Sequence, residues 1–368
     1  MTGSIPPNRE PPPHGRTSPT FPFGASYPFE SRFVTVGRSA DKMGGPPHGY
    51  RMHYLDEGSG PVVVCLHGNP TSGFLFRNLI TALQPDFRVI VPDHVGCGFS
   101  EKPSNVFFRA ADRIAHLQDL LEHLGVTRFS LVMHDWGGPI GTGLAVRRPA
   151  DVERLIYFNT TLAETDLLPA MIRQAASPVV GRLLTQHTGW FVRLLTSLGV
   201  DRPLPEEIKQ GYHRPFRTRA SRRAIWGFVR DIPFSRSHPT APLMDAMVAG
   251  LPALTAKPVK IVWGMKDPCF HPAILDRVAA RFPAAEVVRI ANASHLVLED
   301  APRQSIAEVA EFLRPLTTGP ADTPAVIRPS VPSAHHAPSA AQPPACGLYA
   351  SDRKSTRLNS SHEWISRM

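Results

Sequence analysis

A carboxylate stands where an apolar run turns sharply into a helical segment. In residues 131–139 (LVMHDWGGP), a predicted strand ends just before Asp135 and a predicted helix begins just after it. A strained strand-to-helix turn of this kind exposes a nucleophile, so Asp135 is a candidate for attack on an electrophilic carbon. Gly137 and Gly138 allow the two backbones to approach closely, whereas Met133 is bulky for its place in the turn. The competing interpretation is that Asp135 only caps the helix, as aspartate does well.

Two further residues complete a possible catalytic set. Asp267 follows the apolar run 259–263, and His295 follows the run 285–290. A histidine held by a carboxylate can act as a general base beside a nucleophile. The loop LHGNP, which contains Asn69, follows another apolar run, so we expect Asn69 at the same edge of the sheet. The order nucleophile, acid, histidine predicts a triad of Asp135, Asp267 and His295.

These residues need a scaffold that brings the ends of several strands together. Short apolar runs alternate with segments of helical spacing, and this alternation predicts an α/β fold with a mostly parallel sheet flanked by helices. Residues 160–255 interrupt the alternation with helical or irregular sequence, which predicts a helical cap over the carboxyl ends of the strands. The predicted strands are 61–66, 87–92, 129–133, 155–158, 259–263 and 285–290, and the predicted helices include 109–124, 139–147 and 303–312.

The predicted domain organisation follows from these segments. The core comprises residues 29–159 and 256–316, and the cap comprises residues 160–255. Residues 1–28 and 317–368 are rich in proline and small residues, and we expect both to be disordered. The last residues, 352–368, look like a translated adapter sequence and are left out of the fold prediction.

Composition excludes several classes of protein. The chain has 368 residues, of which 42% are hydrophobic and 19% charged, so it is neither fibrous nor wholly disordered. Its apolar runs are far shorter than the roughly 18 residues of a membrane helix. It shows no secretory signal, and its four cysteines form no metal-binding pattern, so we expect a cytoplasmic protein without a metal.

The chain is basic, with a net charge of +9. The arginines are spread along the chain, which argues against nucleic acid as a partner, but residues 214–230 hold a cluster of them. A solvated helix face explains this cluster, as would docking to a partner enzyme or a membrane surface.

Residues 33–314 resemble α/β-hydrolases with an aspartate nucleophile, specifically the class III haloalkane dehalogenases and the β-lactone decarboxylases of olefin biosynthesis. The matching stretches are HGNPTS (67–72), VIVPDHVGCGFSEKP (89–103), HDWGG (134–138), FVRDIP (228–233), WGMKD (263–267) and SHLVLEDAP (294–302). The resemblance does not separate the two activities. It implies a small hydrophobic substrate, either a haloalkane or a long-chain β-lactone, together with water and halide, and no cofactor. It also suggests that the chain assembles into homo-oligomers.

The resemblance assigns Asn69 and Trp136 as the pair that stabilises a departing halide. Both side chains suit the role, because the indole N–H is only a donor and the amide supplies two donors. Backbone N–H groups of the same residues would bind the oxyanion. Some related dehalogenases place the acid one strand earlier, where this chain has Asn159, so Asp267 is favoured.

Four alternatives to a haloalkane dehalogenase remain. The serious one is decarboxylation of a cis-3,4-dialkyl oxetan-2-one by the same residues. An epoxide hydrolase would need tyrosines from the cap, where only Tyr212 occurs. A fluoroacetate dehalogenase would carry arginine in place of Trp136. A non-catalytic binding protein is disfavoured because every candidate triad residue is present.

Overall fold

The computed structural model describes residues 26–37, 48–104 and 106–314. Contacts divide the chain into a unit Met1–Ala321 and a unit Asp322–Met368, and every described residue belongs to the first. Most of the predicted N-terminal extension and all of the tail 317–368 lie outside the described residues. Tyr27 is buried and packs against Phe29 and Phe74, so the extension 1–28 was predicted a few residues too long.

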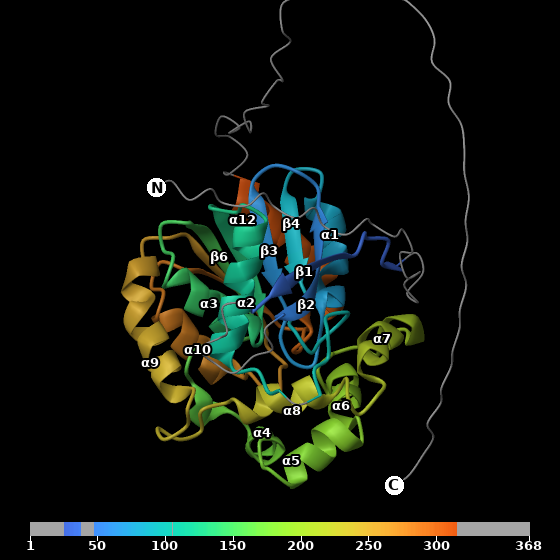
Figure 1. The fold of residues 1–368 in the computed structure, drawn as a ribbon. Helices are drawn as coiled ribbons and strands as arrows, with labels where there is room; N and C mark the ends of the chain where they lie inside the picture. Colours follow the sequence, from blue (N-terminus) through green and yellow to red (C-terminus); the bar gives the residue numbers. More distant parts are fainter. Residues whose placement is uncertain (1–25, 38–47, 105, 315–368) are drawn as a thin grey trace, which may run out of the picture. The chain divides into compact units, whose positions relative to one another are not determined.

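Eight strands form one sheet (Figure 1). They are β1 (Arg32–Val36), β2 (Tyr50–Glu57), β3 (Val62–Leu66), β4 (Arg88–Pro92), β5 (Phe129–His134), β6 (Val152–Phe158), β7 (Val259–Gly264) and β8 (Glu286–Ile290). Their order is β1-β2-β4-β3-β5-β6-β7-β8. β2 is antiparallel to both β1 and β4, and all other pairs are parallel. The predicted α/β fold with a mostly parallel sheet is confirmed.

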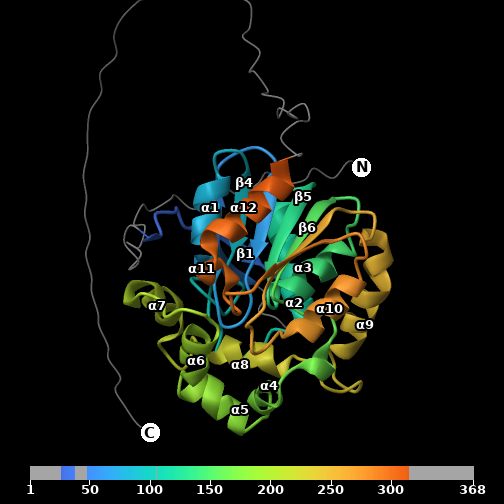
Figure 2. The same ribbon diagram turned by 180° about the vertical axis from the view of Figure 1, so that it is seen from behind.

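The central strands β3, β4 and β5 are buried on both faces, which explains their mainly apolar runs. In β5, Leu131 and Met133 belong to one hydrophobic cluster and Val132 to the other, because successive side chains point to opposite faces. One cluster is covered by α2 (Ala110–His123), α3 (Gly137–Ala145) and α10 (Pro272–Ala280), and the other by α1 (Arg77–Leu83), α11 (Val297–Asp300) and α12 (Pro302–Leu313). Figures 1 and 2 show the two layers from opposite sides.

Between β6 and β7, helices α4 to α8 lie at the carboxyl ends of the strands, whereas α9 packs beside α3 (Figures 1 and 2), and we call residues 160–255 the cap. Its α- and π-helices are α4 (Ala170–Ala175), α5 (Val180–Arg182), the π-helix η5 (Leu183–His187), α6 (Trp190–Leu198), α7 (Glu206–His213), α8 (Arg223–Arg230) and α9 (Ala241–Gly250). The described helices include none with the length and apolar character needed to cross a bilayer.

A buried ion pair of the core also holds a side chain of the cap. The carboxylate of Glu299 in α11 accepts hydrogen bonds from the Arg77 guanidinium at 2.5 and 2.8 Å and from the Tyr212 hydroxyl of α7 at 2.5 Å. The Arg77 and Glu299 side chains are only 6% and 5% exposed. Breaking this pair would therefore leave a buried charge without a partner.

Candidate active site

The backbone at Asp135 is held in a left-handed conformation. Its φ is 51°, which is costly for a residue with a side chain and is often found at functional sites. The Asp135 N–H donates to the Asn159 carbonyl at 3.1 Å, and the Thr160 hydroxyl donates to the Asp135 carbonyl at 2.5 Å. Both contacts fix the turn between β5 and α3, and Asp135 lines the cavity beneath the cap.

Close backbone contacts surround this turn. A β-carbon at Gly68 would overlap the Asp135 carboxylate, so only glycine lets the HGNP loop lie against the candidate nucleophile. A β-carbon at Gly141 would overlap the sulfur of Met133. From the sequence, the bulk of Met133 argues against a tight turn at this place. In the structure, Gly141, one turn into α3, leaves the space that the Met133 side chain occupies.

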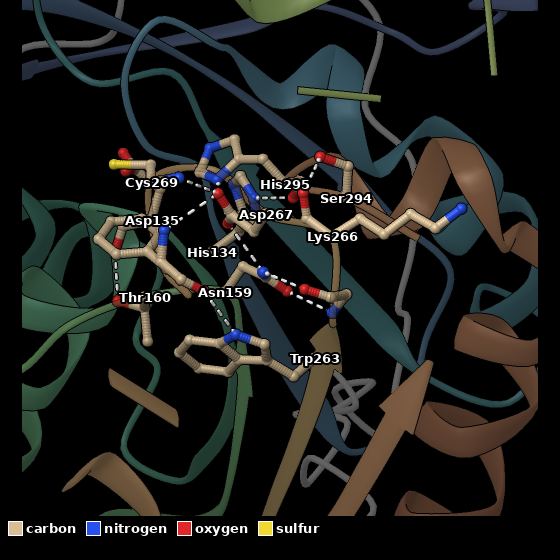
Figure 3. A network of polar contacts seen from close by, with 12 residues as sticks. His134, Asp135, Asn159, Thr160, Trp263, Lys266, Asp267, Cys269, Ser294 and His295 are labelled. Carbon is tan, nitrogen blue, oxygen red and sulfur yellow. Dashed lines mark hydrogen bonds and ion pairs between the residues drawn. The ribbon is translucent and has the colours of Figure 1, made fainter. Parts of the chain in front are cut away.

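His295 and Asp267 form a hydrogen-bonded pair (Figure 3). The Nδ1 of His295 lies 2.9 Å from Oδ2 of Asp267, whose Oδ1 accepts the backbone N–H groups of Cys269 at 2.7 Å and Phe270 at 3.0 Å. Burial alone would raise the pKa of Asp267, but the charge and hydrogen bond of His295 lower it below its usual value. Burial would lower the pKa of His295, and the charge and hydrogen bond of Asp267 outweigh this and raise it. His295 can thus accept a proton, and the ionised Asp267 stabilises the resulting imidazolium.

Asn159 supports the acid of this pair. Its Nδ2 donates to Asp267 Oδ2 at 2.8 Å and to the Gly264 carbonyl at 3.1 Å, while its Oδ1 accepts the Gly264 N–H at 2.8 Å. In the sequence, Asn159 stands out only as an amide at the place where some related dehalogenases have the acid. Its position directly after β6, beside the strand that precedes Asp267, is the signal that could have indicated a supporting role.

His134 was also missed as a positioning residue. Its Nε2 donates to the His295 carbonyl at 2.9 Å, and its ring lies 4.6 Å from the His295 ring. Burial, and then the charge of His295, lower the pKa of His134 to about 3, so it stays neutral. It thereby holds the backbone of the candidate base without adding charge to the site.

Asp135 lies in an environment that weakens solvation of its charge. Burial raises its pKa to about 6, although the charge of His295 and the backbone N–H groups of Asn69 and Trp136 oppose this rise. The Asn69 N–H donates to Oδ1 at 2.6 Å. Asp135 is therefore mainly ionised at neutral pH, and donors suited to an oxyanion already face its carboxyl group.

The side chains of Asn69 and Trp136 line the same cavity as Asp135. Among the described residues, no acceptor is hydrogen-bonded to the Trp136 indole N–H, which leaves this donor for a ligand. Asn69 Nδ2 donates one long bond of 3.3 Å to the Ile225 carbonyl in α8, and its second hydrogen remains for a ligand. The five predicted residues are thus brought to one cavity.

This cavity has a volume of about 140 Å³. Its polar groups come mainly from the core, while the cap supplies apolar side chains that include Leu168, Ile172 and Phe191. No group of metal-binding side chains occurs in the part of the chain that the structure describes. The cavity is suited to an apolar molecule with one reactive centre.

Comparisons with known proteins agree with this geometry. A family model described as alpha/beta hydrolase fold matches residues 61–190. The chain is 36% identical over 273 residues to a cis-3-alkyl-4-alkyloxetan-2-one decarboxylase of Shewanella oneidensis, covering 72% of this chain and 86% of that one. It is 34% identical over 289 residues to haloalkane dehalogenase 2 of Mycobacterium tuberculosis, covering 77% and 95%. The crystal structure of haloalkane dehalogenase DbeA from Bradyrhizobium elkani matches with a TM-score of 0.69 and 28% identity, covering 78% and 98%. The chain therefore belongs to the α/β-hydrolase family, in the group that contains haloalkane dehalogenases and oxetanone decarboxylases.

Proposed function

We propose that this protein is a haloalkane dehalogenase-type hydrolase that converts a haloalkane and water to an alcohol and halide. The observation that carries the proposal is the cavity in which the Asp135 carboxylate faces free donors of Asn69 and Trp136 beside the His295–Asp267 pair. Relatives named as haloalkane dehalogenases support the same reaction class.

In the first step, an Asp135 oxygen forms a bond to the carbon that carries the halogen. The carbon–halogen bond breaks, and the halide leaves with the electron pair. Charge develops on the halogen in the transition state, where the N–H donors of Trp136 and Asn69 stabilise it. The apolar cap side chains exclude water, which strengthens this interaction. The product is an alkyl ester of Asp135.

In the second step, His295 takes a proton from water, and the resulting hydroxide attacks the carboxyl carbon of the ester. Backbone N–H groups of Asn69 and Trp136 stabilise the oxyanion, and the Asp267 carboxylate stabilises the imidazolium. The bond between the carboxyl carbon and the alkyl oxygen breaks, and the leaving alkoxide takes the proton from His295, so that the alcohol departs. The carboxyl group of Asp135 then loses its remaining hydroxyl proton to solvent. Asp135 is restored as a carboxylate.

The second candidate is decarboxylation of a cis-3,4-dialkyl oxetan-2-one to an olefin and carbon dioxide. It is favoured by the relative named for that activity at 36% identity and by the apolar walls of the cavity. An epoxide hydrolase is disfavoured, because the Tyr212 hydroxyl donates to Glu299 and Tyr212 does not line the cavity.

The deciding experiment is a paired assay on the full chain. Bromide release from a 1-bromoalkane and olefin formation from a cis-dialkyl β-lactone are measured side by side, with Asp135→Asn as the inactive control. Bromide release as the faster reaction supports the dehalogenase. Rapid olefin formation with only trace bromide would replace it with the decarboxylase, and no turnover of either substrate would favour a binding protein.

We place this reaction in the cytoplasm, in keeping with three described cysteines that are unpaired. We also expect homo-oligomers. The basic part of the cap offers a surface for a partner enzyme or a membrane. The exposed apolar side chains beside it favour the membrane, as argued below.

A further inference from the structure

Exposed apolar side chains gather on one part of the cap. Seven large apolar residues are exposed in the described chain, and six of them lie between residues 171 and 198. Val179 is 79% exposed. We call these six the apolar face: Met171, Val179, Val180, Leu183, Trp190 and Leu198. Exposed apolar groups of this density mark an interaction surface.

The apolar face is continuous. Helix α4 contacts α5, α5 runs directly into η5, and η5 contacts α6. Leu183, the first residue of η5, follows Val179 by four residues and Val180 by three. These spacings place Leu183 on the same side of the helix as both valines. In Figures 1 and 2, α5 lies on the side of the cap away from the sheet. This face therefore projects from the cap rather than packing on the core.

The mouth of the cavity opens in the same face. Met171 and Leu198 are 39% and 54% exposed, and both also line the cavity that contains Asp135. An apolar molecule can thus pass from the apolar face to the candidate nucleophile along apolar side chains. A surface used only for oligomer contacts has no need of this continuity.

The surroundings of the apolar face are strongly basic. Residues 167–230 contain eleven arginines and lysines and three carboxylates, a net charge of +8 in a chain whose total is +9. Arg173, Arg182 and Arg193 are exposed on the same helices as the apolar face. No described carboxylate forms an ion pair with these three arginines. Their charge is available to an anionic partner.

We propose that the apolar face docks on an anionic lipid bilayer and presents the cavity mouth to the membrane. Valine, leucine and tryptophan side chains would enter the boundary between headgroups and acyl chains, while the arginines contact anionic headgroups. The docking itself is independent of the reaction. That the substrate is a long-chain compound dissolved in the bilayer rests on the proposed function.

Docking is tested by sedimentation of the full chain with vesicles. One set contains phosphatidylglycerol and phosphatidylcholine, and the other contains phosphatidylcholine alone. We expect binding to the anionic vesicles, a weaker association at high salt because exposed charges are screened, and a blue shift of tryptophan fluorescence that Trp190→Phe removes.

Two pairs of variants separate the apolar and the charged contributions. Val179→Asp with Leu183→Asp, neither of which lines the cavity, should abolish vesicle binding and leave bromide release from a short, water-soluble bromoalkane unchanged. Arg182→Gln with Arg193→Gln should weaken binding by about 30-fold, because each basic residue near an anionic surface raises the affinity by about fivefold. Arg147→Gln with Arg303→Gln, a matched pair of exposed arginines outside the cap, should bind as the wild type.

Three outcomes would overturn the docking inference. One is absence of binding to anionic vesicles, and another is equal binding to both kinds of vesicle. The third is light scattering that shows an oligomer dissociated by the Val179→Asp, Leu183→Asp pair, since the face would then join copies of this chain. In each case bromide release can persist, so failure of the docking is distinguishable from failure of the proposed reaction.

Discussion

Replacing His295 by glutamine should separate the two chemical steps. Attack on the haloalkane uses Asp135 and the halide donors, whereas hydrolysis of the ester needs a base to activate water. A general base contributes about 10²–10⁴ in rate, so ester hydrolysis should slow by about that factor while the first halide is still released. The variant should therefore release one halide per site and retain the alkyl group.

The pH dependence of this first release follows from the environment of Asp135. Burial raises its pKa to about 6, and only the ionised form attacks carbon. In the wild type, about nine-tenths of the sites are ionised near pH 7 and about one-tenth near pH 5, so the burst should slow about tenfold over this interval. His295 lowers the pKa of Asp135 through its charge, and in His295→Gln the loss of rate should begin at a higher pH. Wild-type steady-state turnover should also fall on acidification. The pKa of His295 is raised, so this base becomes protonated as the pH falls and can no longer accept a proton from water.

The assay is rapid-quench measurement of bromide from 1-bromobutane, combined with intact-mass spectrometry. Asp135→Asn is the control and should give neither a burst nor an adduct. Sustained turnover of His295→Gln near the wild-type rate would refute the role of the base. A burst without a butyl adduct, or a burst rate unchanged between about pH 5 and 7, would refute the role assigned to Asp135.

Three further substitutions test other parts of the structure. Trp136→Phe keeps a ring against Phe228 but removes the indole donor, and should slow the bromide burst by about 10²-fold; an unchanged burst would show that the halide is stabilised elsewhere. Gly68→Ala places a β-carbon on the Asp135 carboxylate and should remove most activity while circular dichroism stays normal, whereas wild-type kcat/KM would contradict the geometry. Glu299→Ala leaves buried Arg77 unpaired and should lower the free energy of unfolding by about 3–5 kcal/mol in urea titrations; a loss below about 1 kcal/mol would mean that the pair is not buried in solution.

The main features of the site could be predicted from the sequence because parallel strands bring their carboxyl ends to one edge. Asp135, Asp267 and His295 each follow a short, mainly apolar run, and such runs are recognisable without knowledge of the tertiary structure. Strands β1 and β2 were not predicted. β2 has the sequence YRMHYLDE, in which polar and apolar residues are mixed, and its pairing with β4 depends on contacts far apart in the chain.

Asn159 shows why the support of a site is harder to predict than its reactive groups. Its importance depends on the register of β6 against β7, where Phe158 lies opposite Val262 and the next residues face Gly264 and Asp267. The place of Met133 in the turn is equally hard to predict. Its fit depends on Gly141, eight positions later, and the space between them exists only once α3 packs on β5. Both relations are set by tertiary packing rather than by local sequence pattern.

The cavity separates the reaction from the choice of substrate. Asn69, Asp135, Trp136, Asp267 and His295 all come from the core and carry every polar group of the proposed reaction. The cap adds apolar walls, with Thr161 and Thr165 as its only polar members among the described lining residues. A haloalkane and a lactone with two alkyl chains would present different shapes to the same carboxylate, and only the cap can respond to that difference. Selectivity between the two reactions should therefore depend on residues 160–255. This segment also carries six of the seven exposed large apolar side chains of the described residues and a net charge of +5, out of +9 for the whole chain.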